Sequence, residues 1–242
     1  MPKLIGDEEI ANRILRALPP ATFNQMLSHL KRVEFRRGHV ICRPHEPVKH
    51  VYFVNRGMLS VVKTMRDGRT VEVSTRGIEG VSSPETLFGI DTAILGCVVQ
   101  IPVSVFSIRL STLRSAMEKS HTLNALLQGY LHVAEQQLAQ TAACNRLHPL
   151  EQRCCRWLLG AHDSARSDTF PLTHEFLAMM LGVQRQGVSI TAAILQKAGL
   201  IHYARGRMTI TDRAGLEASA CECYDFIRDQ FDRLFSHRKP FA

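Results

Sequence analysis

The sequence predicts an α+β protein in three consecutive parts: a small antiparallel β-barrel or jelly roll, a long helix, and a winged helix-turn-helix. Short β-rich segments recur between residues 33 and 108, and a broad apolar band follows in residues 111–144. Two helix signals and a hairpin signal then lie within residues 172–213. The expected domains are residues 1–110, 111–146 and 147–242.

Residues 7–32 have helical spacing of apolar side chains, and Pro19-Pro20 must divide them into two short helices. The chain begins with Met1–Leu4 and then acidic residues rather than an apolar stretch, so no secretory signal is expected. No apolar run approaches the ~20 residues of a membrane helix. We therefore expect a cytoplasmic protein without a membrane partner.

The next part alternates between short β-branched segments and turns. Asn55-Arg56-Gly57 reads as a turn, and Arg66-Asp67-Gly68-Arg69 reads as a hairpin loop. Many short strands at regular spacing predict an antiparallel barrel or jelly roll. The expected strands are residues 33–35, 39–41, 50–54, 58–64, 70–74, 98–101 and 105–108.

The apolar band of residues 111–144 is wider than one helix face requires. One side can cover the barrel while the other meets the same helix of a second copy. We expect a homodimer in which Leu123, Leu126, Tyr130 and Val133 make this contact. The alternative is a helix that packs only within its own subunit.

Local signals define the helix-turn-helix. Thr173 can cap a first helix, Gly182 allows a turn, a second helix begins near Gln184, and Gly199 ends it. Ile201–Tyr203 and Met208–Ile210 then flank the basic turn Arg205-Gly206-Arg207, which is typical of a wing. A helical hairpin that binds nothing is the alternative, and the wing disfavours it.

The polar side of the second helix carries the groups that read DNA bases. Arg can donate two hydrogen bonds to guanine, and Gln can bond adenine. The wing arginines would contact phosphates. The net charge of +8 fits a polyanionic partner, double-stranded DNA. The expected DNA-binding residues are Thr173, Gln184, Arg185, Gln186, Ser189, Arg205 and Arg207.

Around this motif, Pro149 marks a link, Glu151–Leu159 reads as a helix and Ala161–Asp168 as a loop. Asp212 caps a helix that is expected to end near Cys221. A further helix is expected over Tyr224–Phe235, and a loose tail over residues 237–242.

The seven cysteines include no Cys-x-x-Cys pair, which disfavours a disulfide scaffold. Adjacent helical residues point about 100° apart, so one of Cys154 and Cys155 is expected inside and the other exposed. We expect inert thiols and no metal site, with redox or metal sensing at Cys154-Cys155 or Cys221-Glu222-Cys223 as the alternative.

The order of the parts, the GVQRQGVS segment and the AGLI-to-TITD wing resemble the Crp/Fnr family of bacterial transcription regulators over about residues 30–215. The resemblance implies a homodimer that binds DNA and RNA polymerase, with an effector in a cyclic-nucleotide-binding-like barrel. Arg185 matches the family's guanine-reading arginine. Gln186 stands where many members have Glu, and Ile190 where the cyclic-AMP-responsive members have a second Arg.

The effector region departs from the members that bind cyclic AMP, which use an arginine for the phosphate. No arginine occurs between Arg76 and Arg109, and an uncompensated phosphate is costly to bury, so cyclic AMP is disfavoured. Glu79 and Glu85 are the acidic pocket candidates, and the effector stays unassigned.

The other cofactors of the family also lack support. Only Cys42 and Cys97 precede the long helix, so the iron–sulfur cluster of the oxygen-sensing members is not expected. His39, His45 and His50 have no ligand spacing that favours haem.

Phosphate-loop, dinucleotide, zinc-protease and serine-hydrolase motifs are absent from the sequence, which disfavours an enzyme. The predicted function is a dimeric, sequence-specific transcription regulator. A ligand or redox sensor that acts through protein partners, with weak or no DNA binding, is the alternative.

Overall fold

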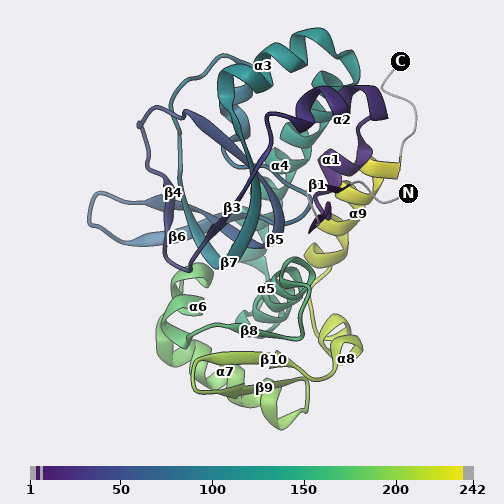
Figure 1. The fold of residues 1–242 in the computed structure, drawn as a ribbon. Coiled ribbons are helices and arrows are strands. Elements are labelled where there is room, and N and C mark those ends of the chain that lie inside the picture. Colours follow the sequence, from purple (N-terminus) through teal and green to yellow (C-terminus); the bar gives the residue numbers. More distant parts are fainter. Residues whose placement is uncertain (1–3, 6–7, 237–242) are drawn as a thin grey trace.

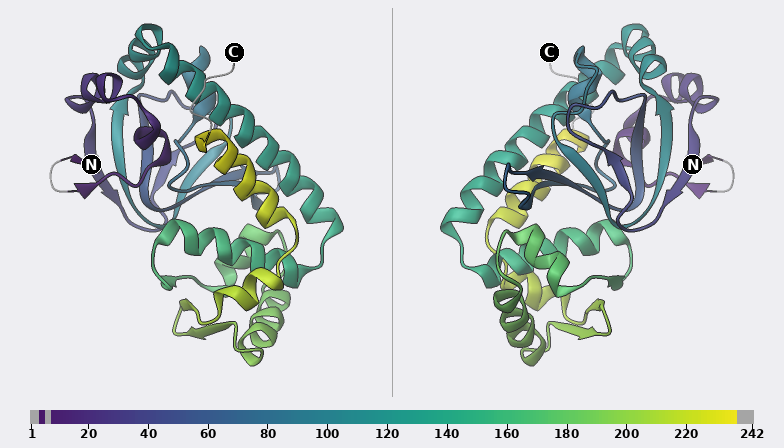
Figure 2. Two further views of the ribbon diagram at one scale, coloured as in Figure 1. Left: turned by 90° about the vertical axis from the view of Figure 1, so that its right-hand side faces the viewer. Right: turned by 90° about the vertical axis from the view of Figure 1, so that its left-hand side faces the viewer.

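The computed structural model describes residues 4–5 and 8–236. A β-rich part lies at one end of the molecule and the winged helix at the other, with helix α4 (His121–Leu147) running alongside the sheet (Figures 1 and 2). The expected tail at 237–242 lies outside the described residues. None of the described helices is long and apolar enough to cross a membrane.

The N-terminal segment is less helical than the two short helices predicted over residues 7–32. Two strands, β1 (Leu4–Ile5) and β2 (Glu8–Glu9), pair before the helices α1 (Arg13–Ala17) and α2 (Pro20–Leu27). The predicted break at Pro19-Pro20 is present, because proline cannot continue a helix through its own position.

The sheet is antiparallel but is not a closed barrel, which corrects the predicted closure. Its order is β3-β7-β5-β6, with β4 also pairing with β7. The 3₁₀ turn η1 (Pro84–Phe88) precedes β7. The strands are β3 (Lys31–Phe35), β4 (Val40–Cys42), β5 (His50–Thr64), β6 (Thr70–Arg76) and β7 (Gly96–Arg109).

The predicted turn at Asn55-Arg56-Gly57 is an irregularity inside the single strand β5, where its register with β7 shifts. Gly57 has φ +82°, and a Cβ there would lie 2.1 Å from the carbonyl oxygen of Pro102. Only glycine fits this close approach, so the turn signal was real although the chain continues as a strand.

The predicted long helix is two helices, α3 (Leu110–Lys119) and α4. Ser120 adopts an extended conformation between them, and its Oγ accepts a hydrogen bond from the amide of Leu123 at 3.2 Å. The break between α3 and α4 is therefore the N-terminal cap of α4.

The last helix, α9 (Cys223–Ser236), returns along α4 (Figure 2). Leu123, Tyr130 and Val133 are buried within the single chain, and the Tyr130 ring stacks on Phe231 of α9 at 6.2 Å. These three predicted dimer contacts already have partners in their own subunit. Leu126 is partly buried and packs on the same cluster.

The winged helix is built on α5 (Leu150–Ala165), which extends through much of the predicted loop at Ala161–Asp168. Its sheet has the order β8-β10-β9. The remaining elements are β8 (Thr169–Pro171), α6 (His174–Leu181), α7 (Arg185–Lys197), β9 (Ile201–Ala204), β10 (Arg207–Ile210) and α8 (Arg213–Ala218).

Cys154 and Cys155 are both buried, so the expectation that one is exposed was wrong. Helix α5 contacts β5 of the large sheet as well as α6, α7, α8 and α9, and is covered on more than one side. The apolar core of the winged helix accordingly includes Met58 and Ile101 from the large sheet.

Candidate nucleic-acid interface

The helix-turn-helix forms where its local signals lie. Thr173 caps α6, and its hydroxyl accepts a hydrogen bond from the amide of Phe176 at 3.3 Å. Gly182 ends α6 with φ +66°, which permits the turn into α7. This geometry leaves the N-terminal turn of α7 free to face a partner.

Three of the predicted readers, Gln184, Arg185 and Gln186, are exposed at the start of α7. Arg185 Nε lies 2.8 Å from Glu175 Oε1 of α6, and both side chains are more than half exposed (67% and 59%). Exposed ion pairs are weak, so this pair can open to let the guanidinium reach a base.

Ser189 is only partly exposed, because its Oγ lies 3.0 Å from His174 Nδ1. The His174 ring stacks on Tyr203 of the wing at 4.1 Å. Burial is the main cause that lowers the pKa of His174, and Arg185 adds to it, which favours the neutral ring. His174 thus joins α6, α7 and the wing, a role that the sequence reading missed.

The wing is a tight hairpin between β9 and β10. Arg205 (φ +50°) and Gly206 (φ +73°) occupy its two central positions, as a type I′ turn requires. The Gly206 carbonyl accepts a hydrogen bond from the amide of Leu172 at 2.9 Å, which ties the turn to the start of the helix-turn-helix. The side chains of Arg205 and Arg207 remain exposed.

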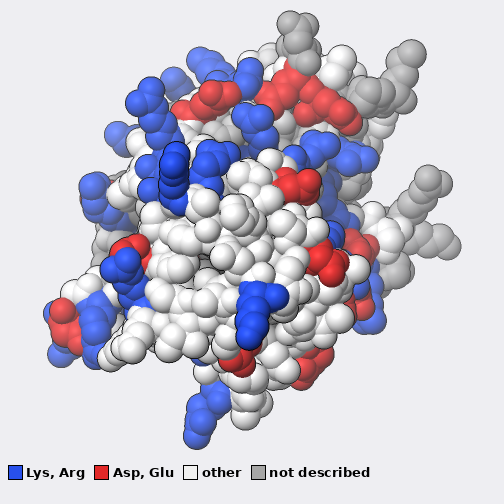
Figure 3. All heavy atoms as spheres, turned by 90° about the horizontal axis from the view of Figure 1, so that it is seen from below, with Lys and Arg blue, Asp and Glu red and all other residues white. Residues whose placement is uncertain are grey.

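Two further exposed side chains on α7 are apolar: Ile190 is 55% exposed and Ile194 is 47% exposed. Such groups can contact the methyl group of thymine. Seen from the winged-helix end, the surface carries separate Lys and Arg side chains rather than one continuous basic patch (Figure 3). The sequence-based prediction considered Ile190 only as a position where other members carry an arginine.

A cavity of about 310 Å³ lies between the large sheet and helices α4, α5 and α9. Glu79 lines it, whereas Glu85 does not, so the two predicted acidic candidates are not brought together. Burial raises the pKa of Glu79, although its carboxylate accepts a hydrogen bond from the amide of Gly77 at 2.7 Å.

Glu72 lines the same cavity and was not predicted. Its carboxyl group accepts hydrogen bonds from the Ser60 hydroxyl and, at 2.8 Å, from Trp157 Nε1 of α5. Burial raises the pKa of Glu72 to about 7. The large sheet and the winged helix therefore share a titratable hydrogen bond at the cavity.

Arg76 is buried near the cavity. Its Nη1 donates to Ser74 Oγ at 2.5 Å, to the Thr75 carbonyl at 2.8 Å and to Gln137 Oε1 at 3.3 Å. Within the described residues, no carboxylate lies within ion-pair distance of Arg76, and its Nε has no hydrogen-bond partner.

Two family models match the chain: the cyclic nucleotide-binding domain over residues 32–120 and the Crp-like helix-turn-helix domain over residues 152–219. No curated protein sequence matches it.

Among solved structures, FixK2 from Bradyrhizobium japonicum superposes with a TM-score of 0.67 at 18% identity, covering 79% of this chain and 98% of its own. TTHB099, a CRP-family transcriptional regulator from Thermus thermophilus, superposes with a TM-score of 0.65 at 23% identity, covering 78% of this chain and 96% of its own. The c-di-GMP-responsive regulator CLP from Xanthomonas campestris superposes with a TM-score of 0.60 at 17% identity, covering 79% of this chain and 99% of its own. With a cyclic nucleotide-binding-type sheet domain followed by a Crp-like helix-turn-helix, the chain belongs to the Crp/Fnr family of transcription regulators.

Proposed function

We propose that this regulator binds DNA sequence-specifically as a homodimer and that a small molecule in the 310 Å³ cavity controls it. The observation that carries the DNA-binding part is the common exposure of the start of α7 and the wing. The His174–Tyr203 stack and the Leu172–Gly206 hydrogen bond hold these two elements together.

In this arrangement Arg185 reads guanine, while Gln184 and Gln186 bond adenine edges. Arg205 and Arg207 contact phosphates, and Thr173 and Ser189 contribute hydroxyl groups beside them. Ile190 contacts a thymine methyl group, so the preferred site differs from that of a reader with a second arginine there.

Selection of bound duplexes from a random pool tests this proposal, followed by fluorescence-anisotropy titration at two salt concentrations. We expect a palindromic site and an affinity that falls with salt. Binding weaker than the roughly 10⁻⁴–10⁻⁶ M of ordinary non-specific binders would contradict it and favour a sensor acting through protein partners.

We place the dimer contact on the side of α4 that α9 leaves open. Leu131 and Leu138 are partly exposed and do not belong to the apolar clusters of the described residues. With Asn124 and Asn145 they form a seam at seven-residue spacing, which suits pairing with the same helix of a second copy. A dimer would present two α7 helices to paired half-sites, where it would also meet RNA polymerase.

The ligand of the cavity is expected to carry an acidic group. Arg13 and Arg213, which line the cavity, are paired with Asp232 and Asp163, each at 2.8 Å. Arg156 also lines it, and its buried Nε has no partner among the described residues. A carboxylate or phosphate would satisfy this guanidinium.

A thermal-shift screen of acidic small molecules, including cyclic mono- and dinucleotides, tests the ligand proposal. The stabilising compound should lose its effect in Arg156→Gln and keep it in Lys119→Gln, a change on the distant helix α3. An equal shift in both variants would contradict the assignment to Arg156.

A further inference from the structure

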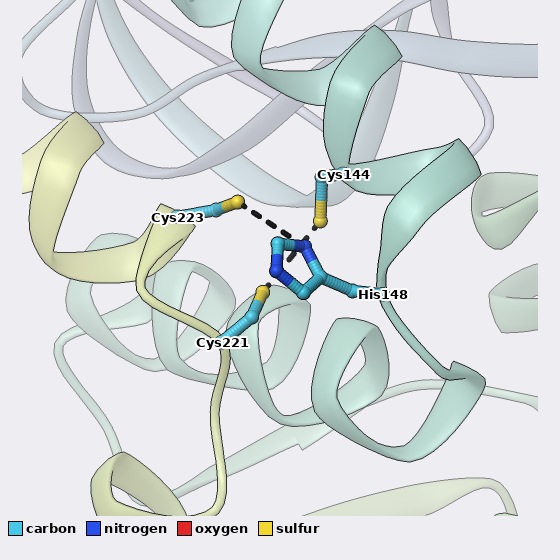
Figure 4. A group of neighbouring side chains, drawn as sticks. All are labelled: Cys144, His148, Cys221 and Cys223. Carbon is cyan, nitrogen blue, oxygen red and sulfur yellow. Dashed lines mark hydrogen bonds between the residues drawn. The ribbon is translucent and has the colours of Figure 1, made fainter.

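Four metal-ligand side chains converge where α4 ends and α9 begins (Figure 4). Cys144 lies in the last turn of α4, and His148 caps that helix. Cys221 lies between α8 and α9, and Cys223 is the first residue of α9. The three thiols are buried and form a cluster of their own.

Two of the ligand-atom distances match those around a single tetrahedral ion, and the other ligand atoms lie close by. Cys144 Sγ lies 3.6 Å from Cys221 Sγ, and His148 Nδ1 lies 3.6 Å from Cys223 Sγ. All four ligand atoms lie within 4.8 Å of one another. Zinc bonds of about 2.3 Å to sulfur and about 2.1 Å to nitrogen place tetrahedral ligand atoms roughly 3.5–3.8 Å apart.

We propose that Cys144, His148, Cys221 and Cys223 bind one Zn²⁺ ion in a closed Cys₃His site. Thiolate and imidazole ligands in tetrahedral geometry suit this ion, and four protein ligands leave no open position for catalysis. The group is too compact for an iron–sulfur cluster, because cluster ligands must surround several metal atoms rather than one.

Groups around the four ligands are placed to support the metal. His148 Nε2 lies 3.0 Å from a carboxylate oxygen of Glu222, so the other nitrogen, Nδ1, is free to face the thiols. A carboxylate in this position orients a ligating histidine and raises its basicity. Gln140 Nε2 donates to Cys223 Sγ at 2.9 Å, which favours the thiolate.

The location gives the ion a structural task. His148 stands directly before Pro149 and α5, so it occupies the connection between α4 and the winged helix. The other two ligands come from the segment in which the chain leaves the winged helix and returns along α4. One ion would therefore join the entry and exit of the winged helix and fix its placement relative to the proposed dimer helix.

Inert thiols were predicted, because the four ligands occur in the sequence as two separate fragments. Cys144-x-x-x-His148 places two ligands one helical turn apart, and Cys221-x-Cys223 follows more than 70 residues later. Neither fragment matches a standard zinc spacing, and only the return of α9 onto α4 brings them together.

The experiment uses the full chain, purified under reducing conditions and analysed for metal by plasma mass spectrometry. We expect about one zinc ion per chain in the wild type, as a single tetrahedral site requires. Cys144→Ser and His148→Gln should lose most of it, and Cys42→Ser, a thiol in the large sheet, should retain it. Cobalt exchanged into the wild type should show thiolate charge-transfer and tetrahedral d–d absorption bands.

The cobalt spectrum needs no variant, so it decides the question even if a ligand substitution prevents folding. Wild-type protein that takes up neither zinc nor cobalt overturns the proposal. So does a Cys144–Cys221 disulfide that persists under reducing conditions, or cobalt bands that survive unchanged in folded Cys144→Ser.

Discussion

Trp157 of α5 donates its indole N–H to the carboxylate of Glu72 in β6 across 2.8 Å, and both side chains are buried. The bond links the large sheet to the winged helix at the wall of the cavity. A ligand in that cavity would therefore sit beside a direct connection between the two parts. Such a connection can carry a coupling free energy between a ligand site and a DNA site.

Glu72 should make stability depend on pH. Its pKa in the folded protein is raised from 4.5 to about 7, so the folded state holds a proton that the unfolded state has released over that interval. The stability that this group contributes is present below pH 4.5 and is lost as the pH rises through 7, a change on the order of 3 kcal/mol.

Urea unfolding of wild type and Glu72→Gln at pH 5 and pH 7.5 measures this contribution. The amide stays neutral and can accept the indole hydrogen bond, so the variant should lose less stability between the two pH values. Equal losses in the two proteins would show that Glu72 titrates normally in the fold.

Arg185 should contribute base preference. Arg185→Ala should weaken binding to the selected site by ~1–3 kcal/mol and relax the preference at one position in each half-site. Anisotropy titrations against the selected duplex and its single-base variants measure both effects. Lys119→Ala, at the opposite end of the molecule, should leave them unchanged, and a uniform loss on all sequences would make Arg185 a phosphate contact instead.

The winged helix could be predicted from signals in nearby residues. The features that the sequence did not predict depend on pairing between distant segments. Thr173, Gly182 and Asp212 act within one helical turn, so the sequence alone locates them. The open sheet and the merged strand through Gly57 depend on pairing between distant segments. No local pattern indicates that α9 covers Tyr130, so the sequence did not show that this residue of the predicted dimer contact is buried within the single chain.

Glu175 should restrain Arg185 in the free protein. Glu175→Gln removes the carboxylate 2.8 Å from Arg185 Nε and keeps the side-chain size. Because exposed ion pairs contribute about 0–1 kcal/mol, affinity for the selected site should rise by a factor of a few. The same titration measures it, and a loss of affinity would indicate that the pair positions Arg185 for binding rather than competing with DNA.

Arg207 should contribute affinity without preference. Arg207→Ala should weaken binding to selected and unrelated duplexes alike and reduce the slope of log K against log salt by about 1, as expected for one lost phosphate contact. A changed consensus in a repeated selection would assign the side chain to a base edge.

A substitution in the proposed dimer seam on α4 can distinguish a contact between copies from packing within one subunit. Leu131→Glu places a charge in the proposed contact between copies, so the protein should become monomeric while its thermal unfolding midpoint changes little. Thr122→Glu, an exposed change on the opposite face of the same helix, is the charge control and should leave the dimer intact. Light scattering coupled to size-exclusion chromatography measures the mass of both.

Loss of folding in Leu131→Glu would show that this leucine belongs to the core of its own subunit, and an unchanged dimer would place the contact elsewhere. A folded monomer that binds a single half-site only weakly would connect the seam to DNA recognition, because the two α7 helices gain affinity for a palindrome only when one dimer presents both.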